Sequence, residues 1–201
     1  MPSSKQTIYF PIMEIIYKYI RHGYARIDKD GKLQITIPLS KKWTKFETIM
    51  IAKWEKLLQR YKKRTHIDPI QKDSILLFGE QVSKTQLMKE HTGTIKNITK
   101  EILKEYATPI FDIYSKKLGI PYKSIIFRKT ISKRGSCTHD QKFSLNLDLI
   151  HLPTKYIKYV IIHEACHLKV KNHSKKFRTL VESFCPNYKE TKKELRKFII
   201  K

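Results

Sequence analysis

Two histidines and a glutamate stand close together in the stretch VIIHEACHLKVKNHSKKF, residues 160–177. His163 and His167 are four positions apart, so on an α-helix they lie one turn apart on the same face. Two imidazoles at this spacing can reach one ion at the distance of about 2.0–2.1 Å that Zn²⁺ prefers. Glu164 projects about 100° away from His163, beside the ion, where a carboxylate can act as general base toward water. Glu164 is therefore the predicted catalytic residue.

A third histidine, His173, follows six residues after His167. Three neutral imidazoles leave one coordination position open, which is typical of a catalytic zinc site, whereas a structural site is closed by four protein ligands. A closed site would need a thiolate, and Cys166 and Cys185 keep that alternative open. The ligands predicted for a Zn²⁺ cofactor are the three histidines His163, His167 and His173.

These side chains need a rigid helix followed by a sharp reversal of the chain. The sequence predicts a helix over residues 154–169, and its apolar residues from Tyr159 to Ile162 would bury it. Asn172 suits a left-handed position that reverses the chain and aims His173 back toward the ion. Ser174 is a good N-cap for a second helix over residues 175–184.

The N-terminal part of the chain predicts β-structure and one long helix. Residues 24–38 alternate in polarity around Asp30-Gly31, which favours a β-hairpin. Ser40 can begin a helix that runs to about Lys63, and residues 74–82 predict a further short β element. The expected fold class is α+β, with an N-terminal hairpin and sheet region and a helical C-terminal part that carries the metal site.

The C-terminal part predicts a long helix before the metal-binding residues. Apolar residues recur at helical spacing over residues 94–119, with a kink expected at Pro109 and an end at Gly119. Strands are expected over residues 122–130 and 142–150, on either side of a loop, SKRGSC. A soft boundary near residue 90 gives two regions, 1–90 and 91–201, which we expect to form one cooperative unit because no linker or repeat separates them.

Composition limits the class of protein. A hydrophobic content of 40% excludes a disordered chain. The sequence has no run of 18 apolar residues and only three cysteines, so neither a membrane span nor a disulfide framework is predicted, and a cytoplasmic location is expected. The formal net charge is +24. Because the lysines are spread through almost every segment, weak polyanion binding is an open alternative and not the main prediction.

The stretch HEACHLKVKNHSKKF resembles the signature of the YgjP-like metal-dependent hydrolases, which are relatives of the SprT-like zincins. In that family a Gly-Ser-Cys loop, a strand ending in Leu-Asn and a proline precede the metal helix. The corresponding segments here are SKRGSC, FSLNLDL and Pro153. The resemblance implies a zincin-like fold with an HExxH active-site helix, with His163, His167 and His173 as zinc ligands and Glu164 as the catalytic residue.

Two positions depart from the family pattern. Arg134 stands where a tryptophan usually precedes Gly-Ser-Cys, and Arg178 replaces a tryptophan after the phenylalanine of HSxxF. Arg134 and Lys133 are therefore candidates for binding the substrate, at an oxyanion or a phosphate. Cys137 has no activating base near it in sequence, so we interpret the Gly-Ser-Cys loop as a structural lining of the cleft.

Three functions are compatible with these residues. The leading hypothesis is a zinc-dependent hydrolase that uses metal-activated water, of the metallopeptidase type, with residues 143–147 lying along a peptide substrate. The second is a nucleoside triphosphate pyrophosphatase, because some YgjP-like members are assigned that activity and the basic charge suits a triphosphate. The third is a basic protein that associates with nucleic acid. The oligomeric state is not predicted.

Overall fold

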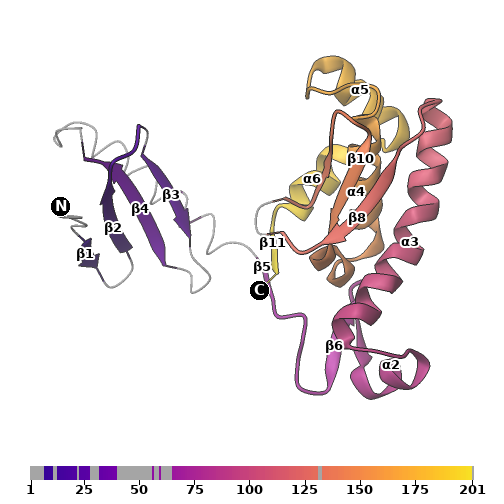
Figure 1. Cartoon of the computed structure of the whole chain (residues 1–201), viewed down its shortest axis with the longest axis horizontal. Coiled ribbons are helices and arrows are strands. Elements are labelled where there is room, and N and C mark those ends of the chain that lie inside the picture. The colour runs from indigo at the N-terminus through magenta and orange to yellow at the C-terminus, as the bar shows by residue number, and fades with distance from the viewer. Residues whose placement is uncertain are drawn as a thin grey trace. The chain divides into compact units, whose positions relative to one another are not determined.

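A computed structural model of the chain describes residues 7–10, 13–21, 23–27, 32–39, 56, 59, 65–130 and 133–200. The chain divides into two compact units, Met1–Thr65 and His66–Lys201, and both are shown in Figure 1. Residue 90, near which a boundary was expected, is the last residue of a helix inside the second unit. How the functions are divided between the parts of the chain stays a prediction.

The first unit contains a four-stranded sheet in the order β1-β2-β4-β3. Strand β1 (Thr7–Phe10) is antiparallel to β2 (Met13–Lys18), which runs parallel to β4 (Leu33–Pro38). Strand β3 (Tyr24–Ile27) is antiparallel to β4, so the pairing predicted for the hairpin over residues 24–38 is confirmed.

Two predictions for the first unit fall largely outside the described residues. These are the turn at Asp30 and Gly31 and the helix expected from Ser40 to Lys63, of which only Lys56 and Gln59 are described, as helical. In the described part of β4, Ile35 and Ile37 are buried, but so are Thr36 and Pro38 from the opposite face. The alternation in polarity therefore does not give this strand one buried face and one exposed face.

The second unit begins with a tight hairpin of β6 (Ser74–Leu77) and β7 (Glu80–Ser83). Phe78 and Gly79 form its turn with φ values of 52° and 91°, the positive values that a type I′ turn needs. A Cβ on Gly79 would lie 2.8 Å from Cγ of Pro153, so a glycine is also required for the hairpin to pack against that proline. Pro153 immediately precedes the helix that carries the first predicted metal-site residues, so the hairpin supports the start of that helix.

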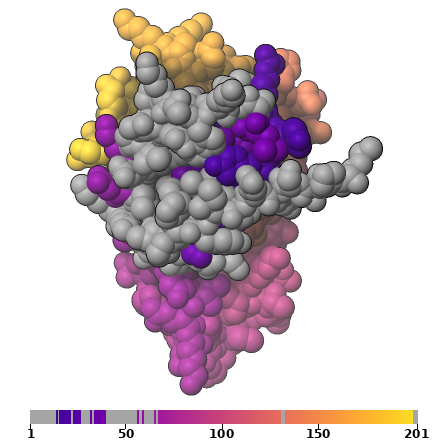
Figure 2. All heavy atoms as spheres, turned by 90° about the vertical axis from the view of Figure 1, so that its left-hand side faces the viewer, coloured from indigo at the N-terminus to yellow at the C-terminus, as the bar shows by residue number. Residues whose placement is uncertain are grey.

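Two helices follow, α2 (Lys84–Glu90) and α3 (Ile95–Leu118). Helix α3 ends at Gly119 with a φ of 68°, as predicted, but it continues without a break through Pro109. Figures 1 and 2 show the segment from β6 to α2 at the opposite end of the second unit from α5 (Lys175–Phe184). Helix α3 spans the distance between these two ends (Figure 1).

A three-stranded sheet lies beside α3, in the order β8-β10-β9. Central strand β10 (Lys142–Asn146) is parallel to β8 (Ser124–Arg128) and antiparallel to β9 (Gly135–Cys137). Gly-Ser-Cys is therefore a short edge strand and not a loop. The strand expected over residues 142–150 ends early, because the chain from Leu147 to His151 turns into a 3₁₀-helix that Asn146 caps through its side chain.

The C-terminal part is helical, as expected. It consists of α4 (Thr154–Cys166), α5 and α6 (Tyr188–Leu195), followed by β11 (Phe198–Ile200). Strand β11 pairs with β5 (Thr65–Ile67) in a two-stranded sheet. The arrangement of separate small sheets and helices confirms the α+β class.

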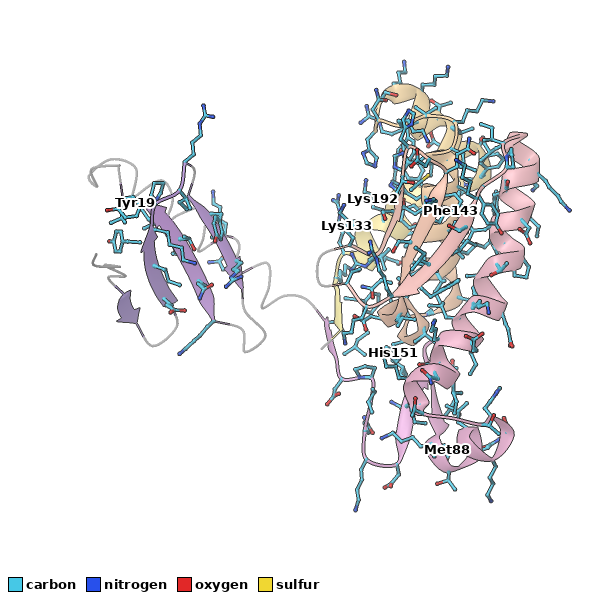
Figure 3. All side chains as sticks on the ribbon, viewed as in Figure 1. Tyr19, Met88, Lys133, Phe143, His151 and Lys192 are labelled. Carbon is cyan, nitrogen blue, oxygen red and sulfur yellow. The ribbon has the colours of Figure 1, made fainter. Side chains whose placement is uncertain are left out.

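The core of the second unit lies between α3, α4 and the sheet. Phe143 of β10 packs against Phe111 of α3 with ring centroids 4.5 Å apart, and both side chains are fully buried. Figure 3 shows Phe143 directed from the sheet toward α3. In the part of the chain that the structure describes, no helix is long and apolar enough to cross a membrane.

Candidate metal centre

Helix α4 holds the first two residues of the predicted site. After its first turn it is buried on most sides, and among its later residues only Lys158 is exposed. Burial of a helix in this way fixes its side chains, which a metal site with defined geometry requires. His163 and Glu164 lie in its last turn, and His167 is its C-cap.

The helix ends three residues earlier than predicted. The backbone N–H groups of His167, Leu168 and Lys169 donate to carbonyls three residues before them, at 2.9–3.1 Å. The last turn is therefore tightened toward 3₁₀ geometry, which satisfies carbonyls that an α-helix end would leave free. The tightening places His167 at the end of the helix, where the chain begins to turn.

Asn172 and Ser174 make the reversal that follows. The prediction of a left-handed Asn172 is wrong, because among the described non-glycine residues only Phe78 and Gln141 have positive φ. Instead, the Asn172 side-chain oxygen accepts a hydrogen bond from the Ser174 N–H at 3.3 Å, which is an Asx-type turn. Ser174 then caps α5 by accepting from the Phe177 N–H, as predicted.

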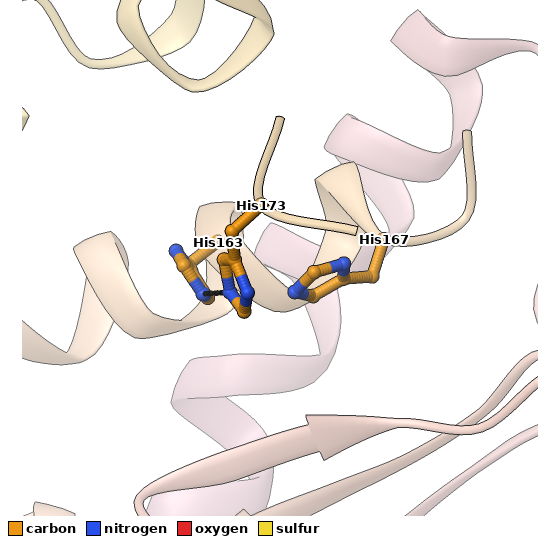
Figure 4. A group of neighbouring side chains, drawn as sticks. All are labelled: His163, His167 and His173. Carbon is orange, nitrogen blue, oxygen red and sulfur yellow. Dashed lines mark hydrogen bonds between the residues drawn. The ribbon is translucent and has the colours of Figure 1, made fainter. Parts of the chain in front are cut away.

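The result is a cluster of three imidazoles, shown in Figure 4. One ring nitrogen from each of His163, His167 and His173 lies within 4.8 Å of the others. The Nε2 atoms of His163 and His173 are 3.1 Å apart. A tetrahedral zinc ion with bonds near 2.05 Å would separate two ligand atoms by about 3.3 Å, so this spacing fits such an ion.

The protonation of the cluster also suits a cation. Burial, with the two neighbouring imidazoles, lowers the pKa of His163 to about 3, and burial lowers the pKa of His167. Both rings are therefore neutral near pH 7, as metal binding requires. His167 Nδ1 lies 3.0 Å from the carbonyl oxygen of Val170, which orients the ring and leaves Nε2 for an ion.

Phe177 supports all three imidazoles from one side. It is 2% exposed, and its ring stacks on His167 with centroids 4.3 Å apart and an angle of 23°. The rings of His163 and His173 meet it edge-on at 4.9 and 5.0 Å. Phe177 therefore limits how far the three imidazole rings can rotate.

The alternative of a closed site with a thiolate finds no support in this geometry. Among the described residues, the group of His, Cys, Asp and Glu that can hold an ion contains the three histidines alone. Cys166 is buried, and burial raises the pKa of its thiol to about 12. The donor set fits a divalent ion with one position left for water or substrate.

Glu164 is the buried carboxylate next to this cluster. Its side chain is 8% exposed, and burial raises its pKa to about 7, while the positive charge of Lys133 acts in the opposite direction. A carboxyl with a pKa near the working pH can both accept and return a proton. Glu164 therefore has the protonation behaviour expected of a general base.

Gly135 fixes the position of the Glu164 side chain. A Cβ at Gly135 would lie 2.8 Å from Cγ of Glu164, 3.1 Å from its Oε1 and 3.1 Å from Cγ1 of Val160. Strand β9 thus passes against α4 so closely that only a glycine fits. The Gly-Ser-Cys motif owes its glycine to this contact, and Cys137, whose thiol pKa is raised by burial, has no sign of activation as a nucleophile.

We expect Gly135→Ala to lower turnover by roughly 10- to 100-fold while the bound metal is retained, because the added methyl group displaces the Glu164 carboxylate. Peptide hydrolysis and metal analysis on the same preparation measure the two quantities. Cys137→Ala, two residues along the same strand, is the control and should keep native turnover. Loss of activity in Cys137→Ala with full activity in Gly135→Ala would reverse the roles assigned to this strand.

A pocket of about 460 Å³ opens beside the cluster. Its walls come from α4, from the loop and strand at residues 133–135, and from the end of α6, while His173 contributes from the turn. The lining residues are Lys133, Arg134, Gly135, Tyr159, Val160, His163, Glu164, His173, Lys192, Leu195 and Arg196. Glu164, His163 and His173 therefore face a space that a substrate can enter.

Arg134 and Lys133 both lie at this pocket, but they are placed differently. The Nη2 of Arg134 donates to the carbonyl oxygens of Leu195 and Phe198 at 2.9 and 3.0 Å. Arg134 thus connects the segment before β9 to the end of α6 and the start of β11. The Lys133 side chain is exposed, and its backbone carbonyl accepts a hydrogen bond from Asn146 of β10. A substrate-binding role stays a prediction for both, and the geometry favours Lys133.

The sequence did not predict that Lys192 and Arg196 line the pocket. They lie about 30 residues beyond His163, and only the return of α6 alongside α4 brings them to the pocket. His151 and His139 lie outside the cluster of three imidazoles. His151 is buried with Nδ1 2.7 Å from the Leu76 carbonyl oxygen, and His139 is exposed.

Three imidazoles converging beside a buried carboxylate in an α+β unit are features of a metal-dependent hydrolase. A family described as "YgjP-like, metallopeptidase domain" matches residues 76–198. This match covers more than half of the chain, and the chain therefore belongs to the YgjP-like metallopeptidase-domain family. The resemblance predicted from the sequence is thereby confirmed, and family membership implies a divalent metal.

Two solved structures of metallopeptidase zymogens are similar to part of this chain. The crystal structure of the metallopeptidase zymogen abylysin of Pyrococcus abyssi has 21% identity and a TM-score of 0.41, covering 44% of this chain and 90% of that chain. The crystal structure of the metallopeptidase zymogen jannalysin of Methanocaldococcus jannaschii has 21% identity and a TM-score of 0.40, covering 44% of this chain and 92% of that chain. The comparison with curated proteins gives no match.

Proposed function

We propose that the chain is a zinc-dependent metallopeptidase of zincin-like fold, with α4 as its active-site helix. The observation that carries this proposal is the position of Glu164. Its buried carboxyl follows His163 directly on α4 and lines the same pocket as His163 and His173. Three imidazoles suit Zn²⁺ better than Mg²⁺, which prefers oxygen ligands. We assign His163, His167 and His173 as ligands and Glu164 as the catalytic base.

In this mechanism the chain contributes ligands, a proton carrier and a shaped cleft. A bound zinc ion supplies Lewis acidity, which polarises the scissile carbonyl and lowers the pKa of a water molecule. Glu164 takes the proton from the attacking water and later donates it to the nitrogen of the leaving amine as the C–N bond breaks. Because the pKa of the carboxyl is raised to about 7, this second transfer is favourable near neutral pH.

The strand that would hold an extended peptide is not the one expected from the sequence. Residues 143–147 were expected to line the substrate, but β10 is the central strand and pairs on both sides. In the part of the chain that the structure describes, β9 is the edge strand next to α4. We therefore assign β9 as the strand that can pair with a peptide backbone.

Nucleotide hydrolysis is the second candidate, and one observation favours it. The pocket contains Lys133, Lys192 and Arg196, which suit a triphosphate as well as an acidic peptide. Against it, the chain has no glycine-rich loop to hold phosphates, and the donor set consists of nitrogen alone. Association with nucleic acid remains a third candidate, which rests on the net charge of +24.

A side-by-side assay separates the candidates. We expect the zinc-loaded protein to cleave an unstructured protein such as casein and to leave nucleoside triphosphates intact. Hydrolysis of triphosphates alone, dependent on Glu164, would replace the peptidase assignment with the second candidate. Turnover of neither, together with DNA binding that falls steeply with salt and persists in Glu164→Gln, would favour the third.

A further inference from the structure

The pocket beside the three histidines carries an excess of positive charge. Four basic side chains line it, and among the described residues that do so Glu164 is the only acid. Figure 3 shows Lys133 and Lys192 on the same side of the second unit, one from the loop before β9 and the other from α6. The charge is therefore contributed by two separate walls and not by one run of sequence.

Three of these basic side chains, Lys133, Lys192 and Arg196, have no carboxylate partner within ion-pair distance among the residues that the structure describes. The ion pairs among the described residues are Lys104–Glu101, Lys129–Asp148, Lys155–Glu194 and Lys189–Glu182. Arg134 is bound to backbone carbonyls, as described above. The acids nearest in sequence to Lys192 are thus either paired elsewhere or, like Glu190, exposed on α6 outside the pocket lining.

The basic side chains of the pocket also act on one another. Burial, Arg196 and Arg178 together lower the pKa of Lys192, so the cations repel one another in a partly desolvated place. A concave, one-sign charge distribution of this kind attracts an oppositely charged ligand and raises its local concentration.

We propose that this pocket is a specificity subsite that binds a negatively charged residue of an acidic peptide, with Lys192 and Arg196 on one wall and Lys133 on the other. The inference rests on the proposed peptidase function and names its substrate class. A carboxylate placed among these three cations would pair with positive charges that no carboxylate of the described residues neutralises. The substrate would then enter the cleft with an Asp or Glu next to the bond that Glu164 attacks.

Binding and cleavage of a matched peptide pair test the proposal. One fluorescein-labelled ten-residue peptide carries three glutamates, and its partner carries three glutamines at the same positions. Fluorescence anisotropy measures binding to the full-length, zinc-loaded chain, and chromatography measures cleavage. Lys192→Gln removes a pocket charge, while Lys193→Gln removes an exposed charge from the next position of α6 and so controls for the high net charge.

We expect native protein and Lys193→Gln to bind the glutamate peptide more tightly than the glutamine peptide. Lys192→Gln should lower the affinity for the glutamate peptide by about fivefold and change the affinity for the glutamine peptide little. Equal affinity of native protein for both peptides would overturn the subsite. Equal losses of affinity for the glutamate peptide in Lys192→Gln and Lys193→Gln would also overturn it. Displacement of the acidic peptide by adenosine triphosphate at about 100-fold lower concentration than by unlabelled peptide would reassign the pocket to nucleotides.

The two proposals fail in distinguishable ways. If native protein binds the glutamate peptide in a Lys192-dependent manner but cleaves neither peptide, the peptidase function falls while the anion-binding pocket stands. If both peptides are bound and cleaved equally, the function stands and the subsite falls. Each outcome therefore decides one of the two proposals.

Discussion

Replacement of Glu164 by glutamine is expected to lower peptide turnover by about 10³- to 10⁴-fold while the protein keeps its zinc. The amide has nearly the shape of the carboxylate, so it fits the same space against Gly135. It cannot accept a proton from water, however, and burial leaves little solvent at this point to act in its place. The loss should appear in kcat, because the step removed is chemical.

Metal content and kinetics measured on the same sample check this expectation. Glu190→Gln is a suitable control, because Glu190 is exposed on α6 and does not line the pocket. Turnover at the native rate in Glu164→Gln would remove Glu164 from its role as base. A variant without zinc would instead indicate that the carboxylate contributes to holding the ion.

Zinc is expected to raise the melting temperature of the native protein, and His173→Ala is expected to abolish that increase. At a zinc concentration about 1,000 times the Kd, binding stabilises the folded state by about 4 kcal/mol. For a unit of this size this corresponds to roughly 10 °C in Tm. Removal of one of three imidazoles leaves two ligands, so at the same zinc concentration the site should be largely empty.

His173 is suited to this test because its side chain is exposed, and its loss should leave the fold intact. His139→Ala, at another exposed histidine, should keep the full zinc-dependent shift. Calorimetry or thermal scanning with zinc and with chelator measures both. A full shift in His173→Ala would exclude His173 as a ligand, whereas no shift in the native protein would exclude the zinc site altogether.

The sequence could predict those features of the site that depend on residues close together along the chain. His163 and Glu164 sit on a helix whose apolar pattern is plain, and His173 needs only one turn of the chain to return. The capping role of Ser174 follows from the same local rules. The error at Asn172 is also local, because an Asn can reverse a chain either by a left-handed backbone or through its side chain, and sequence does not distinguish the two.

The rest of the site depends on contacts between distant segments. Gly135 matters because β9 passes against α4, and Lys192 matters because α6 returns beside the pocket. Arg134 was predicted as a substrate ligand from its place in a motif, but its bonds to Leu195 and Phe198 follow only from the fold. The order of the strands also depends on distant contacts, because the sequence predicted a strand at the position of β10 but did not predict that it is the central one.

The three imidazoles lie close together along the chain. Bringing them together is therefore a separate requirement from forming the pocket beside them. His163 and His173 are only ten positions apart, so an ion that joins them closes a short loop at small entropic cost. One continuous segment, from α4 to the turn before α5, thus carries all three histidines that we assign as metal ligands. The shape of the pocket depends in addition on the strand of Gly135 and the helix of Lys192, so the imidazole cluster is built locally while the pocket is built by packing between distant segments.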